Sequence, residues 1–306
     1  MRTDAAARLG LSLLVEPGDP RLRDVLELHT PARVLEAVLT GESIDGTALP
    51  PSWCERADNL ERARDVARER AVSAGLRWMC PGDAQWPERV ADLDHVEPLQ
   101  DTAGAPLGLW VRGAARLDEL AERSVAIVGA RSCTTYGAEC ASEMAADLAS
   151  GGFTIISGAA YGIDACAHRG ALVVDRPTIA VLACGADRAY PEAHTSLLDR
   201  IVDEGGLVIS EQTPAAAPLR HRFLSRNRII AALSQGTTVI EAELRSGSLN
   251  TLHWADLLGR TTMALPGPVT SRRSAGAHAA VRAGKAVLVT SGLEVAEELA
   301  GLGMAG

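Results

Sequence analysis

The feature that most limits the fold is an alternation of short apolar runs with helix-length segments, which begins at Ser124. The runs are rich in β-branched and aliphatic residues and cover residues 125–128, 154–156, 178–182, 207–209, 238–240, 262–265 and 287–289. Almost continuous apolar runs are typical of strands buried on both faces, and helices of this length connect parallel strands. The pattern therefore predicts an α/β fold with a doubly wound, mostly parallel sheet.

The first 75 residues follow a different pattern, because their apolar residues recur at helical spacing and prolines separate the segments. Leu22, Val25 and Leu26 show the i, i+3, i+4 spacing, and Pro50 and Pro51 interrupt the series. We expect a small all-helical domain over residues 1–75, an α/β domain over residues 76–300 and a short tail over residues 301–306. The turn-rich stretch that starts at residue 76 is expected to lead into the second domain.

Composition excludes several classes of protein. The chain has 306 residues, of which 47% are hydrophobic and 23% are charged, so it can bury ordinary globular cores. No apolar run approaches the roughly 18–20 residues that cross a bilayer, and no secretion leader is recognised, so we expect no membrane association. The six cysteines include no CxxC pair, which favours reduced thiols and a cytoplasmic location.

Charge is distributed unevenly along the chain. The net charge is −9, yet residues 212–293 contain ten basic and three acidic residues and carry +7, which leaves −16 for the remainder. A positive segment in an acidic protein is suited to a polyanion that binds locally. The alternative is that these arginines only keep a helical surface solvated.

The loops that follow the first two predicted strands have residues suited to phosphate. Gly129, Arg131 and Ser132 precede a helix, so backbone amides, the helix dipole and a guanidinium could meet an anion there. Ser157 and Gly158 follow the second strand and allow close approach of a ligand or of another backbone. The three tyrosines of the chain, Tyr136, Tyr161 and Tyr190, fall in the first three strand-exit loops. They could stack on bases or only pack their loops.

The densest candidate site is the run from Arg220 to Arg228, which precedes an apolar helical segment. It contains Arg220, Phe223, Arg226, Asn227 and Arg228, and no acidic residue occurs between Glu211 and Glu241. Arginines interleaved with an aromatic residue are typical of a groove that follows a phosphodiester backbone. The alternative is a helix start with solvated arginines. Ser246, Gly247 and Ser248, which open the next helix, add hydroxyls and amides to the predicted site.

No catalytic or metal-binding motif is recognised: HExxH, GxSxG, GxxxxGK[ST] and paired-histidine spacing are missing. Asp164 and Glu241 are the only carboxylates near the predicted anion loops. Asp164 could act as a general base, but capping of the following helix also explains it, and Glu241 likewise has a structural explanation. Glu211 could form a salt bridge with Arg226 or Arg228 and shape the groove. We therefore expect no enzyme activity, no catalytic residue, no metal and no cofactor.

Several short motifs occur in a fixed order between residues 77 and 293. They are Pro81-Gly82-Asp83 with Trp86-Pro87, Leu109 to Gly113, Val128 to Arg131 with Tyr136-Gly137, Ser157 to Ala159 with Gly162-Ile163-Asp164, Tyr190-Pro191, Phe223 with Arg226 to Ile230, Glu241-Ala242, Ser246 to Leu249, and Pro266-Gly267. With these motifs the sequence resembles the DNA processing protein A family (DprA, also called Smf). The sequence departs from the family pattern at Leu224, His194 and His278, which puts the local loop geometry in question.

The resemblance implies an extended Rossmann domain preceded by a small SAM-like helical domain. It also implies a protein that binds and protects single-stranded DNA, loads the RecA recombinase during natural transformation and forms a homodimer. Arg131, Arg220 and the base-contacting Phe223 match the family's binding residues. Many members carry a C-terminal winged-helix domain, and none is expected in this sequence, which stops at Gly306.

An enzyme of another class remains as an alternative function. Rossmann-like nucleoside-monophosphate phosphoribohydrolases share glycine-rich loops of this kind, and their hallmark is a Gly-Gly-x-Gly-Thr-x-x-Glu loop. Here Gly236 and Thr237 lie one residue too far from Glu241, and no glycine pair precedes them. A dinucleotide oxidoreductase is less favoured still, because the first loop lacks the GxGxxG spacing.

Overall fold

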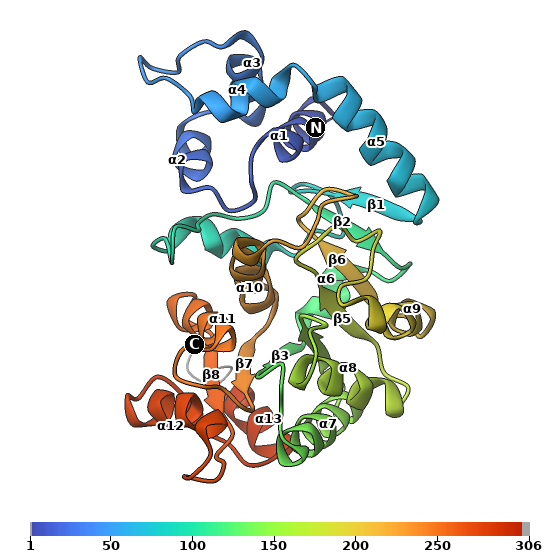
Figure 1. Ribbon diagram of the computed structural model, residues 1–306, viewed down its shortest axis with the longest axis vertical. Coiled ribbons are helices and arrows are strands. Elements are labelled where there is room, and N and C mark those ends of the chain that lie inside the picture. Colours follow the sequence, from blue (N-terminus) through green and yellow to red (C-terminus); the bar gives the residue numbers. More distant parts are fainter. Residues whose placement is uncertain (1, 302–306) are drawn as a thin grey trace.

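The computed structural model describes residues 2–301, and Figure 1 shows a layer of N-terminal helices above a larger α/β part. The N-terminal helices are α1 (Arg2–Leu14), α2 (Pro20–Leu28), α3 (Pro31–Thr40), α4 (Pro51–Ala57) and α5 (Leu60–Ser73). Proline occupies the first turn of α2, α3 and α4, where its missing N–H would in any case have no helical partner. The Asp19 and Thr30 side chains accept hydrogen bonds from backbone N–H groups at the starts of α2 and α3.

These helices bury an apolar core around Leu11, Val34 and Trp53. That core also includes Leu107, and Ala67 and Ala71 of α5 pack into the core of the α/β part. Helices are therefore confirmed in the N-terminal region, whereas its independence as a domain and its SAM-like class remain predictions. The predicted tail lies outside the described residues from 302 onward.

A single nine-stranded sheet organises the rest of the chain. Its strands are β1 (Leu76–Met79), β2 (Leu109–Arg112), β3 (Ser124–Val128), β4 (Thr154–Ser157), β5 (Thr178–Val181), β6 (Leu207–Ser210), β7 (Gly236–Val239), β8 (Thr261–Ala264) and β9 (Val287–Leu288). Their order is β1-β2-β6-β5-β4-β3-β7-β8-β9, and all neighbours from β6 to β9 are parallel. The predicted α/β fold with a mostly parallel sheet is confirmed. β1 and β2 add an antiparallel edge that was not predicted.

Helices cover both faces of this sheet. They are α6 (Leu117–Glu122), α7 (Thr135–Ser150), α8 (Ile163–Val173), α9 (Thr195–Asp203), α10 (Arg220–Leu233), α11 (Gly247–Leu257), α12 (Ala275–Arg282) and α13 (Gly292–Gly301), with short 3-10 helices η1 (Glu88–His95), η2 (Glu192–His194) and η3 (Arg272–Ser274). In β3, Ala126 and Val128 pack in the core that holds α10 and α11, while Val125 and Ile127 pack in the core of α7 and α8. The period of two along the strand directs alternate side chains to the two layers.

The strand order places a topological switch point between β3 and β7. From β3 the chain proceeds to β4, β5 and β6 on one side, and from β7 to β8 and β9 on the other. The loops after β3 and β7 therefore diverge and leave a crevice at the carboxyl ends of these strands, where ligands bind in open α/β sheets. Among residues 2–301, no helix combines the length and apolar character needed to cross a membrane.

Candidate nucleic-acid interface

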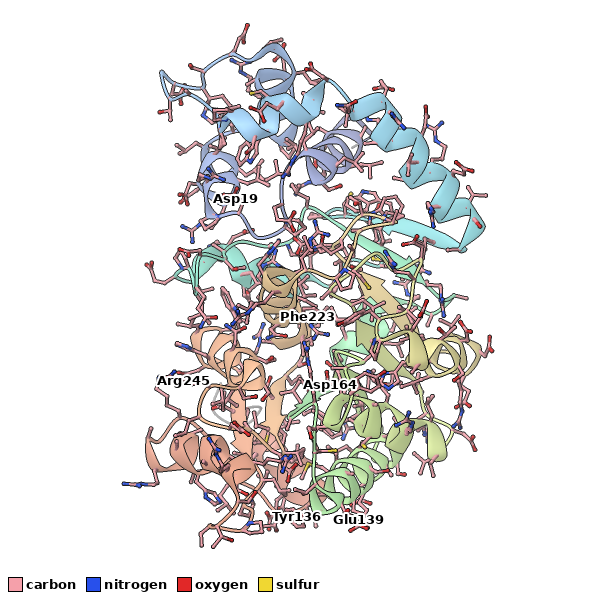
Figure 2. The ribbon with its side chains drawn as sticks, viewed as in Figure 1. Asp19, Tyr136, Glu139, Asp164, Phe223 and Arg245 are labelled. Carbon is pink, nitrogen blue, oxygen red and sulfur yellow. The ribbon has the colours of Figure 1, made fainter. Side chains whose placement is uncertain are left out.

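A groove with a volume of about 920 Å³ opens at this switch point, between the strand-exit loops and helices α10 and α11. The predicted DNA-binding residues that line it are Gly129, Arg131, Arg220, Phe223, Arg226, Asn227, Ser246, Gly247 and Ser248. In Figure 2, Phe223 and Asp164 lie near the middle of the molecule, and Arg245 lies on the α11 side of them. Loops far apart in the sequence thus contribute to one surface.

An aromatic and cationic cluster forms one part of the groove. The Arg131 guanidinium lies 4.6 Å from the centroid of the Phe223 ring, in a cation–π arrangement. The Tyr190 ring lies 5.5 Å from the same ring, and 42% of Tyr190 is exposed. Arg131, Tyr190 and Phe223 come from the β3 loop, the β5 loop and α10, so three elements build a platform on which a base could stack.

Arg226 forms the floor of the groove. Arg226 is 7% exposed. Its Nη1 donates a hydrogen bond to the Val181 carbonyl, and its Nε has no hydrogen-bond partner among the described residues. Burial lowers the pKa of Arg226 and the charge of Arg131 adds to this effect, while Asp164 opposes it. A guanidinium remains charged in a protein, so Arg226 presents a positive charge beneath the groove. A Cβ on Gly158 would lie 1.9 Å from Arg226 Nη1, which explains why glycine occupies that position.

Asp164 lies beside this floor, lines the groove and is buried. Burial raises the pKa of Asp164, and the charge of Arg226 and the N–H of Ala160 offset part of that effect. Asp164 Oδ2 accepts a hydrogen bond from Ala160 N at 3.3 Å. The carboxyl therefore holds the β4–α8 loop. It does not cap the helix as the sequence suggested, because Gly162 occupies the N-cap position of α8 and no side chain makes a cap hydrogen bond there.

The start of α11 forms the opposite wall of the groove. Ser246 caps this helix, because its Oγ accepts a hydrogen bond from Ser248 N, and the two hydroxyls lie 2.7 Å apart. A Cβ at Gly247 would meet no atom within 4 Å, so the backbone there is open to a ligand. Asn227 Nδ2 donates to the Gly247 carbonyl at 3.1 Å and joins α10 to this turn. The free N–H groups of a helix start suit an anion.

The structure places Arg228 away from the groove, against the sequence prediction that it contacts DNA. Its side chain has no exposed surface, and its two terminal nitrogens each donate to a Glu211 oxygen at 2.7 Å. The salt bridge proposed for Glu211 therefore forms with Arg228 and not with Arg226. Arg228 thus joins α10 to the end of β6 through Glu211 and to the segment before β2 through the Gly104 carbonyl.

Ser157, Gly158 and Ser132 do not line the groove either. Ser157 is fully buried and its Oγ donates to the Ile127 carbonyl, which joins β4 to β3. Gly158 leaves room for the Arg226 guanidinium. The Ser132 carbonyl and hydroxyl accept hydrogen bonds from Arg273, so Ser132 anchors the β3 loop to η3. In the structure these three residues contact other parts of the chain, and none of them lines the groove.

Sequence reasoning missed several groove residues. Gln100, Arg245, Asn250 and His253 line the groove. Asn227 Nδ2 donates to Asn250 Oδ1 at 3.2 Å, and Asn250 Nδ2 donates to Gln100 Oε1 at 3.1 Å. Arg245 directly precedes the predicted Ser-Gly-Ser turn and could have been included with it. Nothing in the sequence around Gln100 indicates that this residue reaches the groove.

Glu241 lies beneath the groove and holds the β3 loop. Its oxygens accept hydrogen bonds from Thr134 N at 2.9 Å and from Thr134 Oγ1 at 2.5 Å. A Cβ on Gly137 would lie 2.5 Å from the Glu241 carboxyl carbon, so the helix start packs directly on this carboxylate. Both oxygens of Glu241 are thus used to fix the loop that carries Arg131. Among the described residues, no group of three or more His, Cys, Asp or Glu side chains could hold a metal ion.

Comparisons with known proteins identify relatives of this chain. The family model for DNA recombination-mediator protein A matches residues 77–300. A putative DNA processing protein DprA from Mycobacterium tuberculosis is 41% identical over 295 residues, which cover 96% of this chain and 74% of that protein. The Smf protein of Escherichia coli K12 is 40% identical over 210 residues, which cover 68% of this chain and 55% of that protein.

Two solved structures of such proteins share the fold. The X-ray structure of DprA from Streptococcus pneumoniae superposes with a TM-score of 0.74 and 30% identity, over 97% of this chain and 98% of that one. A DNA processing protein A structure from Helicobacter pylori, described for its single-stranded DNA binding mode, gives a TM-score of 0.61 and 27% identity over 73% and 95% of the two chains. The chain therefore belongs to the DNA recombination-mediator protein A family, which includes the DprA and Smf proteins.

Proposed function

We propose that this protein binds single-stranded DNA in the groove between α10 and α11. The observation that carries the proposal is the meeting of Arg131, Tyr190 and Phe223 next to Arg220 in one groove. Cations can neutralise phosphates there while the aromatic rings stack on bases, and such stacking requires bases that are not paired within a duplex. The Helicobacter pylori relative, whose structure is described for its single-stranded DNA binding mode, supports this proposal.

The chemistry of the groove favours binding with little sequence preference. Guanidinium groups contact phosphates, which are the same in every sequence, and aromatic faces accept every base. The arginines line a groove whose volume of about 920 Å³ suits a flexible strand. We expect duplex DNA of the same length to bind more weakly.

The wider role that we propose is that of a recombination mediator without enzyme activity. In this role the protein protects incoming single-stranded DNA, loads RecA onto it during natural transformation, acts as a homodimer and works in the cytoplasm. The family's description as a recombination mediator supports this role. The use of Asp164 and Glu241 as loop anchors also supports it, because an enzyme that cleaves nucleotides needs a carboxylate free for acid or base chemistry.

The test is a fluorescence anisotropy titration with single-stranded and duplex oligonucleotides of equal length. Wild type should bind the single strand more tightly. Arg220→Ala should weaken binding and flatten the log–log salt dependence by about 0.7 for each phosphate that the protein no longer neutralises. Arg68→Ala, which removes one exposed charge from α5, serves as the matched control and should leave both quantities unchanged. Equal or tighter binding of duplex by wild type would overturn the proposal.

A further inference from the structure

The first turn of α10 lacks the features that normally begin a helix. Leu219, at the cap position, makes no side-chain cap hydrogen bond, and the first turn contains no acidic residue. It opens instead with Arg220, His221 and Arg222. Positive charge at the positive end of a helix dipole is unfavourable, and free backbone N–H groups there need a partner. The helix that carries Phe223 therefore requires a negative charge from elsewhere.

Glu16, in the loop between α1 and α2, supplies that charge. Arg222 Nε donates to Glu16 Oε1 at 2.6 Å, and Arg222 Nη2 donates to Glu16 Oε2 at 2.9 Å, which makes the contact bidentate. His221 Nε2 lies 3.1 Å from the same Oε1. Burial alone would raise the pKa of Glu16, but the hydrogen bonds and charges of Arg222 and His221 outweigh burial and lower the pKa. The carboxylate is therefore held charged against α10.

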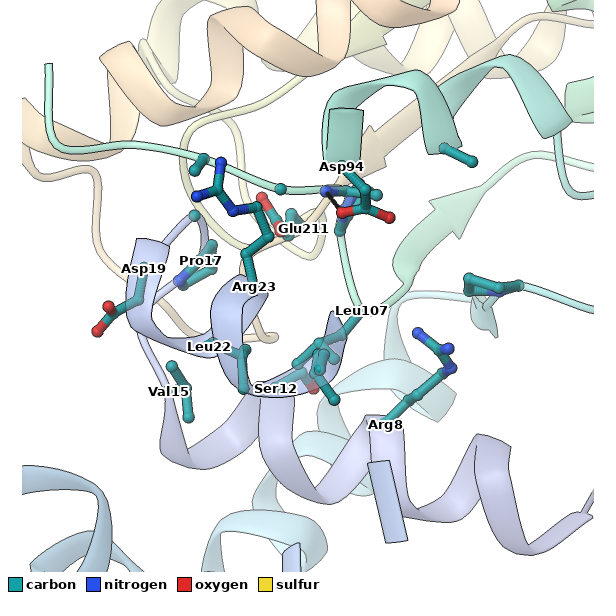
Figure 3. Close-up of a pocket in the computed structure, with 18 of the residues that line it drawn as sticks. Arg8, Ser12, Val15, Pro17, Asp19, Leu22, Arg23, Asp94, Leu107 and Glu211 are labelled. Atoms are coloured by element: carbon teal, nitrogen blue, oxygen red, sulfur yellow. Dashed lines mark hydrogen bonds between the residues drawn. The ribbon is translucent and has the colours of Figure 1, made fainter. Parts of the chain in front are cut away.

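The rest of this loop packs along the same face of α10. A Cβ on Gly18, whose φ is +81°, would lie 3.5 Å from both Ser225 Cβ and Arg228 Cζ. The Gly18 carbonyl accepts a hydrogen bond from Ala103 N at 2.9 Å. Pro17 and Asp19 of this loop line a cavity of about 420 Å³ between the N-terminal helices and the α/β part, and Glu211 lines the same cavity (Figure 3). The loop between α1 and α2 thus contacts α10 at Gly18 as well as through the ion pair of Glu16 with Arg222.

Helix geometry separates this contact from the DNA groove. At about 100° per residue, Arg222, Ser225 and Arg228 lie on one side of α10, whereas Arg220, Phe223 and Asn227 lie on the other. Arg220, Phe223 and Asn227 line the groove, and Arg222 does not. Glu16 therefore contacts α10 on the side away from Phe223 and does not line the groove.

We propose that Glu16 is a positioning residue for the DNA groove: it holds the side chains of Arg222 and His221 in the first turn of α10 and so fixes the place of Arg220 and Phe223. This inference rests on the proposed binding of single-stranded DNA. The N-terminal helices then contribute to DNA affinity although they do not line the groove at α10 and α11. The positioning acts through Arg222, whose guanidinium donates one hydrogen bond to each carboxylate oxygen of Glu16.

The sign of one substitution distinguishes positioning from simple electrostatics. Glu16→Gln removes a negative charge close to an anion-binding groove, so Coulomb attraction alone would make DNA bind more tightly. If Glu16 positions α10, the same change frays the first turn and makes DNA bind more weakly. The two explanations therefore predict opposite results from the same variant.

The experiment compares full-length wild type, Glu16→Gln and Glu55→Gln in the anisotropy titration with single-stranded DNA. Glu55 is exposed on α4 and has no hydrogen-bond partner among the described residues, so it matches the change of charge within the same helices. We expect Glu16→Gln to bind about three- to five-fold more weakly, which corresponds to the loss of one charge interaction at a helix start. Glu55→Gln should bind as wild type does.

Two further measurements keep the result unambiguous. Hydrogen exchange of the peptide that covers residues 219–226 should be faster in Glu16→Gln than in wild type, with or without DNA. Glu16→Gln should add no further weakening to an Arg222→Gln protein. Unchanged or tighter binding by a folded Glu16→Gln protein, with exchange as in wild type, would overturn the inference. If wild type itself failed to bind single strands, the proposed function would fall, while the exchange measurement would still decide whether Glu16 holds α10.

Discussion

Replacement of Arg228 by methionine is expected to destabilise the protein by about 3–5 kcal/mol, because it leaves a buried carboxylate without its partner. Arg228 has no exposed side-chain surface and the Glu211 side chain is 9% exposed. Their two hydrogen bonds are each 2.7 Å long, and Arg228 Nε donates a third to the Gly104 carbonyl at 2.9 Å. Methionine fills most of the volume, so the loss is mainly electrostatic.

This loss is large in comparison with the total free energy of unfolding of a typical domain, which is about 5–15 kcal/mol. The double variant Arg228→Met/Glu211→Met should recover most of it, since a buried ion pair can often be replaced by apolar side chains of similar volume at little cost. Recovery in the double variant would show that the unpaired charge, and not the poorer packing, causes the destabilisation of the single variant.

The assay is urea unfolding followed by far-UV circular dichroism, with the midpoint compared at constant slope. Arg68→Ala again provides a surface control. An Arg228→Met protein with the wild-type midpoint would refute the reasoning, because it would show that Glu211 has another partner or is accessible to water. A folded Arg228→Met protein should keep its affinity for single-stranded DNA, in contrast to Arg220→Ala.

Three further outcomes are expected. Phe223→Ala should weaken single-strand binding by about 1–3 kcal/mol in the anisotropy titration, because a base stacks on the ring, and Phe223→Trp should retain the binding. Equal affinities of Phe223→Ala and wild type would contradict stacking. Because the pKa of Glu16 lies below its ordinary value of 4.5, its interaction with Arg222 should stabilise the protein above that pH, and this stabilisation should disappear as the pH falls through the lowered value. The urea midpoints of wild type and Glu16→Gln should therefore converge in acid, and a constant difference would refute the linkage. Chromatography should detect no base released from nucleoside monophosphates; release that Glu241→Gln abolishes would favour the phosphoribohydrolase instead.

The parallel strands could be predicted from sequence because their burial is complete. All residues of β3, β4, β5, β6 and β7 are buried, and most of them are aliphatic or β-branched, which leaves almost continuous apolar runs in the sequence. β1 gives no such signal, since Leu76, Arg77 and Trp78 are only half-buried and Arg77 uses its guanidinium on the Gly113 and Ala115 carbonyls. An edge strand of four residues with one buried side chain looks like a loop in the sequence.

The groove was predictable where a strand exit and a cluster of arginines coincide, as at Arg131, Arg220 and Phe223. The role of each arginine within the cluster could not be predicted. The residue type shows that the side chain is charged, but it does not show whether the side chain faces the groove or the interior. Arg220 and Arg228 belong to one helix and one charge cluster, yet Arg220 lines the groove and Arg228 is sealed against Glu211. That difference depends on segments distant in sequence, the strand end at Glu211 and the loop at Glu16, which cover one side of α10 and leave the other to the groove. The loop between the N-terminal helices α1 and α2 thus helps to set which side of α10 faces the groove, although the sequence alone suggests two independent units.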